Sequence, residues 1–486
     1  MPCAAPRRLS PVAALLTFRL NQLPQAGAGL PHPARAIAVA AILINVFMAT
    51  LESAIANTAL PAIAADLGVS EASSIWVISA YHLAMVAALL PIASLGEIIG
   101  HRRISMAGLV LFTLASLACG LAPSLPWLIA GRLVQGVGAA GILGVALAMT
   151  RFVYPREQLG RGLGLNALVV SLSLAAGPTA ASLILSLASW HWLFLINVPL
   201  GLLGLALGIR ALPPTPRSAR RYDAVAGLLC ALFLALLVYT LNAYAHDVGT
   251  GRNTAYALAT LALLALLLKR QSGRGAPMLA TDLLRRPIFA LSAAATLGAF
   301  AAQTLAFVAL PFMLQSLLGY TQVQTGFLIT PWPALAALSA AWAGALSDRH
   351  PPGLLGGIGM AVLAAGLLSL VALPAAPHAF DLGWRMALCG AGFGFFQAPN
   401  MRAMLADAPP ERSGGASGMT SSSIMLGQSL GAALVAGLFT LSGAAAAPAA
   451  LWLGVACAVI AGIASLLRLR HAAAAGAGPR LDLKRV

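Results

Sequence analysis

Residues 127–149 read WLIAGRLVQGVGAAGILGVALAM, an apolar run interrupted by one charged residue, Arg132. A helix needs about 20 consecutive apolar residues to cross the hydrocarbon core of a bilayer, and this run has that length. Blocks of the same Leu, Ala, Val and Gly composition recur along the chain, separated by short charged or Pro- and Gly-rich stretches. The pattern predicts a helical membrane protein with many spans.

The composition supports this prediction. The 486 residues are 60% hydrophobic and only 9% charged, whereas soluble domains carry about 25% charged residues. Too little charge is present to cover a water-facing surface, so most of the outside must face lipid. The five cysteines form no CxxC pair and adjoin no His cluster. We interpret them as packing residues, with no disulfide or metal.

Fourteen apolar runs can be marked in the chain. They cover residues 36–61, 73–95, 104–122, 127–149, 162–187, 192–211, 224–244, 254–268, 288–318, 325–346, 354–373, 382–402, 416–440 and 449–467. We therefore predict an all-α integral membrane fold with 14 transmembrane helices. An even number of spans places both termini on the same side.

The Lys and Arg residues set the expected orientation. If the N-terminus is cytoplasmic, all of them lie in cytoplasmic segments except Arg132, Arg252 and Arg385. This positive-inside asymmetry predicts a multi-pass protein of the bacterial cytoplasmic (inner) membrane with both termini in the cytoplasm. It also accounts for the net charge of +16 without a nucleic-acid partner. The true start codon stays open.

Short motifs repeat at one offset of about 250 residues. Ala-Leu-Pro occurs at 59–61 and 309–311, while Leu-Gly-Glu at 95–97 has the counterpart Leu-Ser-Asp at 346–348. Two related six-helix halves around a central site are a known transporter plan. We expect these segments: a tail (1–35), a first half (36–212), a linker with two inserted helices (213–287), a second half (288–467) and a tail (468–486).

Two ionisable groups fall deep in predicted spans. Glu52 and Arg132 lie at similar depth, in the outer half of the bilayer. Burial disfavours the charged carboxylate and a nearby Arg favours it, so relative movement of the two would change proton affinity and couple a proton gradient to transport. The alternative is a static salt bridge that fixes helix packing. His82 is a secondary titratable candidate, or else a histidine bonded to a neighbouring helix.

Other polar residues in or near spans suggest a cavity for a substrate, although any one of them could only hold helices together. These candidates are Asn57, Gln135, Asn166, Gln303 and Gln397.

Two further features suggest conformational roles. Gly177-Pro178 falls within a predicted span, where proline bends a helix, and it is either a hinge and seal or an ordinary kink. Glu97 could act as a latch by pairing with Arg102, Arg103 or a neighbouring helix N-terminus, or serve only as a topology anchor. The remaining gating candidates are Gly100, which permits an unusual backbone angle, and Asp348 and Arg349 in the second half.

Five motifs together resemble the major facilitator superfamily, in its 14-helix drug:proton antiporter branch. The pattern LDxTIVNVALP matches 51–61 with Glu52 for Asp, and RxxQGxGAA matches 132–140. The pattern GPxxGG matches 177–182 with Ala181 and Ser182 for the last glycines, and WRWxFxINVP matches 190–199. The pattern GxLxDRxGRR matches 93–103 and has a second-half copy at 344–349. The resemblance covers the chain from about residue 36 onward and implies a role of Arg132 in proton coupling.

We therefore expect a proton-driven exporter of small amphipathic or toxic compounds, working by alternating access. No metal spacing, phosphate loop or GxSxG motif is present, so we expect neither an enzyme nor a cofactor, only a proton gradient. The expected partners are the substrate, protons and the bilayer, and any periplasmic adaptor is encoded elsewhere. A narrow-specificity proton-coupled metabolite transporter and a non-transporting receptor or scaffold stay open.

Overall fold

The computed structural model describes residues 29–69, 71–74, 76–246, 251–273, 277–320, 322–374, 377–442 and 446–474. Within these ranges every regular element is a helix. The side chains of Asn57 and Pro178 lie outside the described part.

Among its described residues, the first half of the chain forms eight α-helices. They are α2 (Ala34–Asp66), α3 (Glu71–Ser74), α4 (Trp76–Ile99), α5 (His101–Gly120), α6 (Leu125–Val153), α7 (Leu159–Leu187), α8 (His191–Leu195) and α9 (Asn197–Ala211), with the short η1 (Arg156–Gln158) before α7. The next segment contains α10 (Ala224–His246), α11 (Gly251–Gln271) and α12 (Thr281–Leu284).

The last part of the chain contributes the second group of long helices. They are α13 (Pro287–Phe312), η2 (Met313–Leu317), α14 (Gln322–Ile329), α15 (Pro331–Leu346), α16 (Pro352–Val371), α17 (Ala379–Asp407), η3 (Pro410–Arg412), α18 (Ser413–Ser442) and α19 (Ala447–Ala474).

Within the described residues, 12 helical segments are long and apolar enough to cross a membrane. Two of the fourteen predicted runs, 162–187 and 382–402, are not among them and correspond to α7 and α17, each 29 residues long. Both lie inside the bundle, where α7 packs on α2 and α15 and α17 packs on α15 and α16. The count of fourteen spans therefore stays a prediction. The prediction of an all-helical membrane fold agrees with the described structure.

Helices within each group pack closely because small residues line their contacts. A Cβ atom at Gly108 of α5 would lie 2.8 Å from the Gly141 Cα of α6, so the two backbones touch at this point. One buried apolar cluster is formed only by α13 to α19, and separate clusters are formed by α2 to α9. The two groups meet where α7 packs on α15 and where α18 packs on α4 and α6.

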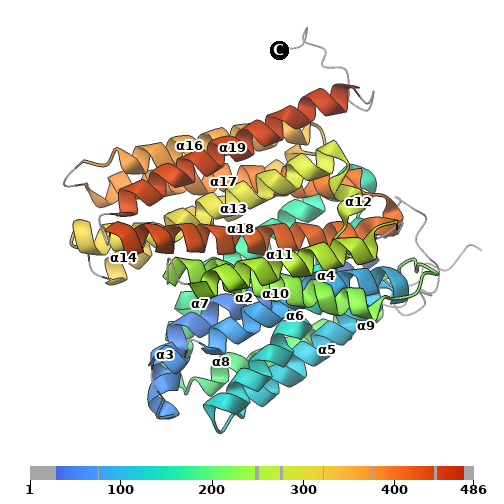
Figure 1. Cartoon of the computed structure of the whole chain (residues 1–486), viewed down its shortest axis with the longest axis horizontal. Coiled ribbons are helices and arrows are strands. Elements are labelled where there is room, and N and C mark those ends of the chain that lie inside the picture. Colours follow the sequence, from blue (N-terminus) through green and yellow to red (C-terminus); the bar gives the residue numbers. More distant parts are fainter. Residues whose placement is uncertain are drawn as a thin grey trace, which may run out of the picture.

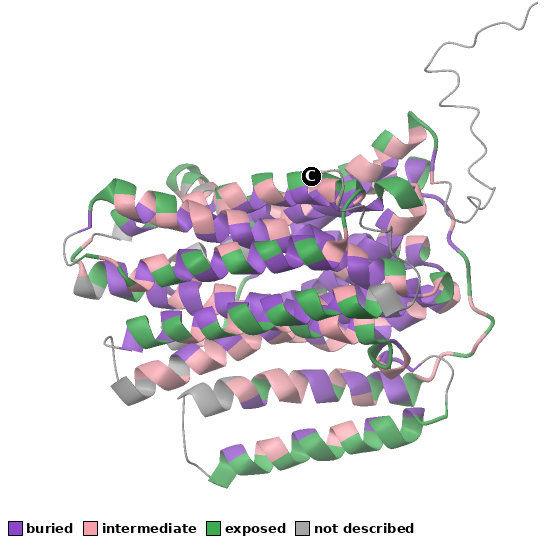
Figure 2. Cartoon of the chain, turned by 90° about the horizontal axis from the view of Figure 1, so that it is seen from above, coloured by how far each residue is buried: buried purple, intermediate pink, exposed green. Residues whose placement is uncertain are grey.

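In Figure 1 the α10–α11 pair lies in front of the other helices, across the junction between the two groups, and so forms an outer layer of the bundle. Helix α10 packs against α4 and α18, one from each group, and α11 contacts α10. Most residues of α11 are exposed, as the outermost helix in Figure 2 shows. Such an apolar exposed face is what contact with lipid requires.

Figure 1 also shows that α19 ends on the same side of the bundle as α12. Helix α4 ends on this side as well, and we call this side the Glu97 end.

Tryptophans at the ends of membrane-spanning helices generally lie at the membrane–water interface, but Trp190 does not. Trp76, Trp127 and Trp192 are more than half exposed, but Trp190 is 3% exposed. Its indole N–H donates to Asp66 at 2.9 Å, and its ring stacks on His191. Trp190 therefore packs inside the bundle instead of facing the membrane interface.

Candidate functional site

Glu52 and Arg132 form a buried ion pair between α2 and α6. The Arg132 Nη1 atom donates to the Glu52 Oε1 atom at 2.5 Å, and both side chains are at most 1% exposed. Each partner neutralises a charge that would otherwise be very costly at this depth. The pairing that the sequence left open between these two residues is thus present in the structure.

Neutral groups complete the coordination of this pair. Asn197, the first residue of α9, donates to the second Glu52 oxygen at 2.6 Å. Arg132 also donates to Gln135 Oε1 at 2.7 Å and, through Nε, to the Val77 carbonyl at 2.8 Å. The Nη2 atom of Arg132 has no hydrogen-bond partner in the described part of the chain. Gln135 therefore belongs to the ionic cluster, and it is not among the residues that line the central cavity.

A cavity of about 320 Å³ lies between the two groups of helices, lined by α2, α4, α6, α7, α13, α17 and α18. His82, Asn166 and Gln397 contribute polar groups to its wall, together with Thr50 and Gln428. The described lining residues include no Asp, Glu, Lys or Arg. The cavity is thus polar at several points but carries no fixed formal charge.

Two amides line this cavity, one from each group of helices. Asn166 on α7 is 4% exposed and Gln397 on α17 is 3% exposed. The Nδ2 atom of Asn166 and the Oε1 atom of Gln397 have no hydrogen-bond partner among the described residues. Because an unsatisfied buried polar atom is costly, these two atoms offer a donor and an acceptor to a bound molecule.

Apolar and flexible side chains line the remaining wall. Met85, Met401 and Met425 contribute thioethers, and Phe300 contributes an aromatic ring. Methionine adapts its shape to different partners because its side chain is unbranched and polarisable. This lining suits the apolar part of an amphipathic ligand.

One layer of side chains separates the ion pair from the cavity. The Arg132 guanidinium lies over the Tyr81 ring, 4.3 Å from its centroid. Tyr81 donates to the Ala49 carbonyl at 2.8 Å and meets the ring of its neighbour His82 edge to face. Since Ala49 and His82 both line the cavity, a movement of Arg132 can reach the cavity wall through Tyr81.

Glu97, at the last turn of α4, joins distant parts of the chain. Its Oε2 atom accepts from Arg412 Nη1 at 2.8 Å and also from Arg220. Its Oε1 atom accepts from the Gly415 N–H, in the first turn of α18, at 2.6 Å. The expected pairing with a helix N-terminus is present, but pairing with Arg102 or Arg103 is not, because Arg102 turns away and donates to the Ile209 carbonyl.

Asp348, after α15, makes the corresponding contact with α7. Its carboxylate accepts from the Gly160 N–H at 2.8 Å and the Arg161 N–H at 3.2 Å, and Arg402 lies 3.3 Å away. Partial burial raises the pKa of the Asp348 carboxyl, while the N–H donors and Arg402 act in the opposite direction. We call the Glu97 and Asp348 contacts together the two carboxylate clamps.

Close backbone contact accompanies the Asp348 clamp. A Cβ atom at Gly344 would lie 2.6 Å from the Gly160 carbonyl oxygen and from the Gly164 Cα. Helices α7 and α15 therefore touch at the Glu97 end, and the clamp holds them in that position.

The other residues singled out by sequence lie apart from these clusters. Arg103 and Arg349 are exposed at the Glu97 end, and Gln303 does not line the cavity. Gly100 has the positive φ expected of it, at +103°. Helix α7 continues without a break through Gly177 and position 178.

A second buried guanidinium was not expected from the sequence. Arg468 on α19 is 3% exposed and donates to Ser292 Oγ at 2.8 Å and to the side-chain oxygen of Asn400, Oδ1, at 2.7 Å. Asn400 in turn donates to Thr296 at 2.7 Å. This network ties α13, α17 and α19 together, and the residues that the structure describes supply no carboxylate to it. The one available sequence signal is the position of Arg468 directly after an apolar run.

Comparison with known proteins gives one family. The model of the Major Facilitator Superfamily matches residues 42–432. The uncharacterized transporter YebQ of Escherichia coli (strain K12) is 46% identical over 91% of this chain and 97% of its own length. The multidrug resistance protein Stp of Mycobacterium tuberculosis (strain CDC 1551 / Oshkosh) is 31% identical over 81% of this chain and 73% of its own. The riboflavin transporter RibZ of Clostridioides difficile (strain 630) is 28% identical over 77% and 81%.

Proposed function

The chain belongs to the major facilitator superfamily of membrane transporters, and we propose that it exports small amphipathic compounds in exchange for protons. The observation that carries this proposal is the buried Glu52–Arg132 pair, one side-chain layer behind a central cavity. A proton on Glu52 would remove the charge that holds Arg132, so the guanidinium would shift towards its neutral partners. That shift would reach the cavity wall through Tyr81.

The arrangement at the Glu97 end supports alternating access. Both carboxylate clamps join the two groups of helices there, and these contacts would close the cavity on that side. We place this side in the cytoplasm of a bacterial inner membrane, because the Lys and Arg residues concentrate in its segments. Export then requires the clamps to open, admit substrate and close again.

The cavity lining supports a substrate without a fixed positive charge. A lipophilic cation would be bound most strongly by a buried carboxylate, and none is found among the described lining residues. The amides of Asn166 and Gln397 instead suit carbonyl, hydroxyl or imide groups on a largely apolar molecule. We therefore propose neutral, hydrogen-bonding amphipathic compounds of drug size.

A narrow-specificity metabolite transporter is the second candidate. The name of one relative, the riboflavin transporter RibZ, favours it, while the name of another, the multidrug resistance protein Stp, favours broad export. In either case the expected partners are substrate, protons and lipid, with any periplasmic adaptor supplied by another chain.

Transport in proteoliposomes tests the proposal. Wild type and Glu52→Gln would be reconstituted with an imposed pH gradient, and uptake of riboflavin and of ethidium would be followed. Asp66→Asn is the matched control, because Asp66 is on the same helix but outside the ionic cluster. We expect gradient-driven flux of the neutral compound in wild type and the control but not in Glu52→Gln. Equal flux in all three proteins would remove Glu52 from coupling.

A further inference from the structure

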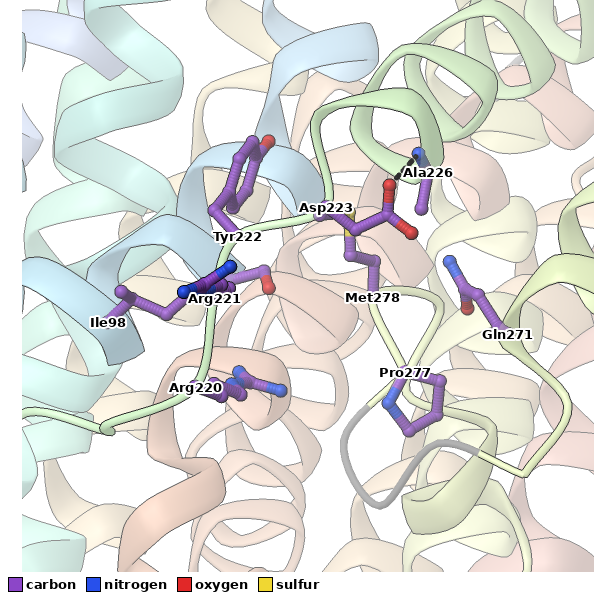
Figure 3. Close-up of a pocket in the computed structure, with 10 residues that line it drawn as sticks. Ile98, Arg220, Arg221, Tyr222, Asp223, Ala226, Gln271, Pro277 and Met278 are labelled. Carbon is purple, nitrogen blue, oxygen red and sulfur yellow. Dashed lines mark hydrogen bonds between the residues drawn. The ribbon is translucent and has the colours of Figure 1, made fainter.

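A second pocket, separate from the central cavity, opens at the Glu97 end. It has a volume of about 470 Å³ and lies between the end of α4, the segment before α10, the end of α11 and residues 277–278. Figure 3 shows Arg220 reaching into it on one side and the Gln271 amide facing Asp223 on the other. No residue of this pocket lines the central cavity.

The charges around this pocket leave one cation in excess. Asp223 is already occupied by Arg270, whose guanidinium approaches both its oxygens at 3.0 to 3.1 Å. The remaining carboxylates, Glu97 and Asp282, are held by Arg412. Arg221 lines the pocket, is exposed, and makes no ion pair with any residue that the structure describes.

A buried amide donor points to a ligand at the same place. Gln271 is 4% exposed, and its Oε1 atom accepts from the Leu279 N–H at 3.3 Å. Its Nε2 atom has no partner among the residues that the structure describes. A buried N–H group without an acceptor is costly, and an anion in the pocket would supply one.

We propose that this pocket binds a phosphate group, held by Arg220, Arg221 and the Gln271 amide. Guanidinium groups match the geometry and charge of phosphate oxygens better than any other side chain. Two sources carry this group: the headgroup of an anionic phospholipid in the adjoining leaflet and a soluble phosphate ester.

Occupation of the pocket would act on the Glu97 clamp. Arg220 contacts Glu97 and lines the pocket as well. A phosphate in the pocket competes with Glu97 for this guanidinium, so binding weakens one of the contacts that close the Glu97 end. The inserted α10–α11 pair, which together with its flanking segments 220–223 and 277–278 forms most of the pocket, thereby gains a regulatory role.

Binding to the purified full-length protein in neutral detergent tests the proposal. The probes are dihexanoyl phosphatidylglycerol, dihexanoyl phosphatidylcholine and glycerol 3-phosphate, and the dissociation constant is taken from ligand-dependent thermal stabilisation. We expect Arg221→Gln to weaken binding of phosphatidylglycerol about tenfold, because a charge-assisted hydrogen bond is lost. Gln271→Glu keeps the acceptor for Leu279 and replaces the free donor with a negative group, so it should weaken binding at least as much.

Arg217→Gln is the matched control, because Arg217 is an exposed residue of the same segment that does not line the pocket. It should bind within about twofold of wild type. Equal weakening in Arg217→Gln and Arg221→Gln, or binding of phosphatidylcholine as tight as that of phosphatidylglycerol, would overturn the site. Binding of glycerol 3-phosphate as tight as that of the lipid would identify a soluble ligand, and binding of the lipid alone a headgroup. The measurement needs neither substrate nor gradient, so its failure is distinct from failure of the export proposal.

Discussion

The Glu97 carboxylate accepts a hydrogen bond from the N–H of Gly415, 318 positions further along the chain, at 2.6 Å. Asp348, in the second group of helices, makes the same kind of contact with the first group by accepting from the N–H of Gly160 at 2.8 Å. In each case a carboxylate at the end of one helix caps the first turn of a helix from the other group, where the helix dipole favours negative charge. The two clamps are therefore equivalent contacts, placed by the sequence repeat.

Replacing Glu97 with glutamine should loosen the first clamp. Glutamine keeps the size and one acceptor, but it loses the charge that attracts Arg412 and Arg220. A lost charge-assisted hydrogen bond is worth about 1.5–3 kcal/mol, enough to shift a two-state population at least tenfold. A cysteine at Ser421, which lines the cavity, should then react faster with a membrane-impermeant maleimide in inside-out vesicles.

Glu157→Gln is the control for this experiment, because Glu157 is exposed near the same end and belongs to neither clamp. The native cysteines would first be replaced. Unchanged labelling in Glu97→Gln would mean that Glu97 does not hold the Glu97 end closed.

Gly344→Ala should separate α7 from α15. The new Cβ atom would lie 2.6 Å from backbone atoms of Gly160 and Gly164, which cannot rotate away. Overpacking of this kind costs about 1–3 kcal/mol, so the thermal unfolding midpoint in detergent should fall. Gly326→Ala is the control, since a Cβ atom there has nothing within 4 Å. If the unfolding midpoint of both variants equals that of wild type, then the α7–α15 contact can accommodate the added methyl group without loss of stability.

Arg132→Met should destabilise the protein strongly, because it leaves the Glu52 carboxylate buried without its cation. Removing one member of a buried pair typically costs about 3–5 kcal/mol. The double variant Glu52→Gln/Arg132→Met removes both charges and should unfold at a temperature closer to wild type than Arg132→Met does. Additive losses in the double variant would show that the two side chains are not coupled energetically.

The fold could be predicted from the sequence because membrane spans depend on local composition. Apolar runs such as 127–149 form helices wherever they pack, and Glu52 and Arg132 stand out within such runs because charge is rare there. Asn197, which donates to Glu52, was missed because a single amide near the start of a span gives no signal of its partner.

The pairing of Glu97 with a helix N-terminus was predicted, but its arginine partners could not be, because they depend on how distant helices dock. Arg102 and Arg103 are near Glu97 in sequence, yet helix direction turns them away, and Arg220 and Arg412 take their place. For the same reason Asn166 and Gln397 reach the cavity whereas Gln303 does not. Side-chain type marks these residues as polar, but only the packing of α7, α13 and α17 determines which way each one faces.

Gln397→Leu should separate recognition of neutral substrates from proton coupling. Leucine has nearly the same volume but offers no acceptor in place of the Gln397 Oε1 atom. A hydrogen-bond donor of the ligand that is buried without an acceptor lowers the binding free energy by about 1–3 kcal/mol. The KM for riboflavin in proteoliposomes should therefore rise about tenfold. Proton coupling should persist, because the Glu52–Arg132 pair lies behind the cavity wall. Gln303→Leu, a change of the same chemistry outside the cavity, should leave the KM within about twofold of wild type. If both variants behave alike, then the Gln397 amide does not contact the substrate.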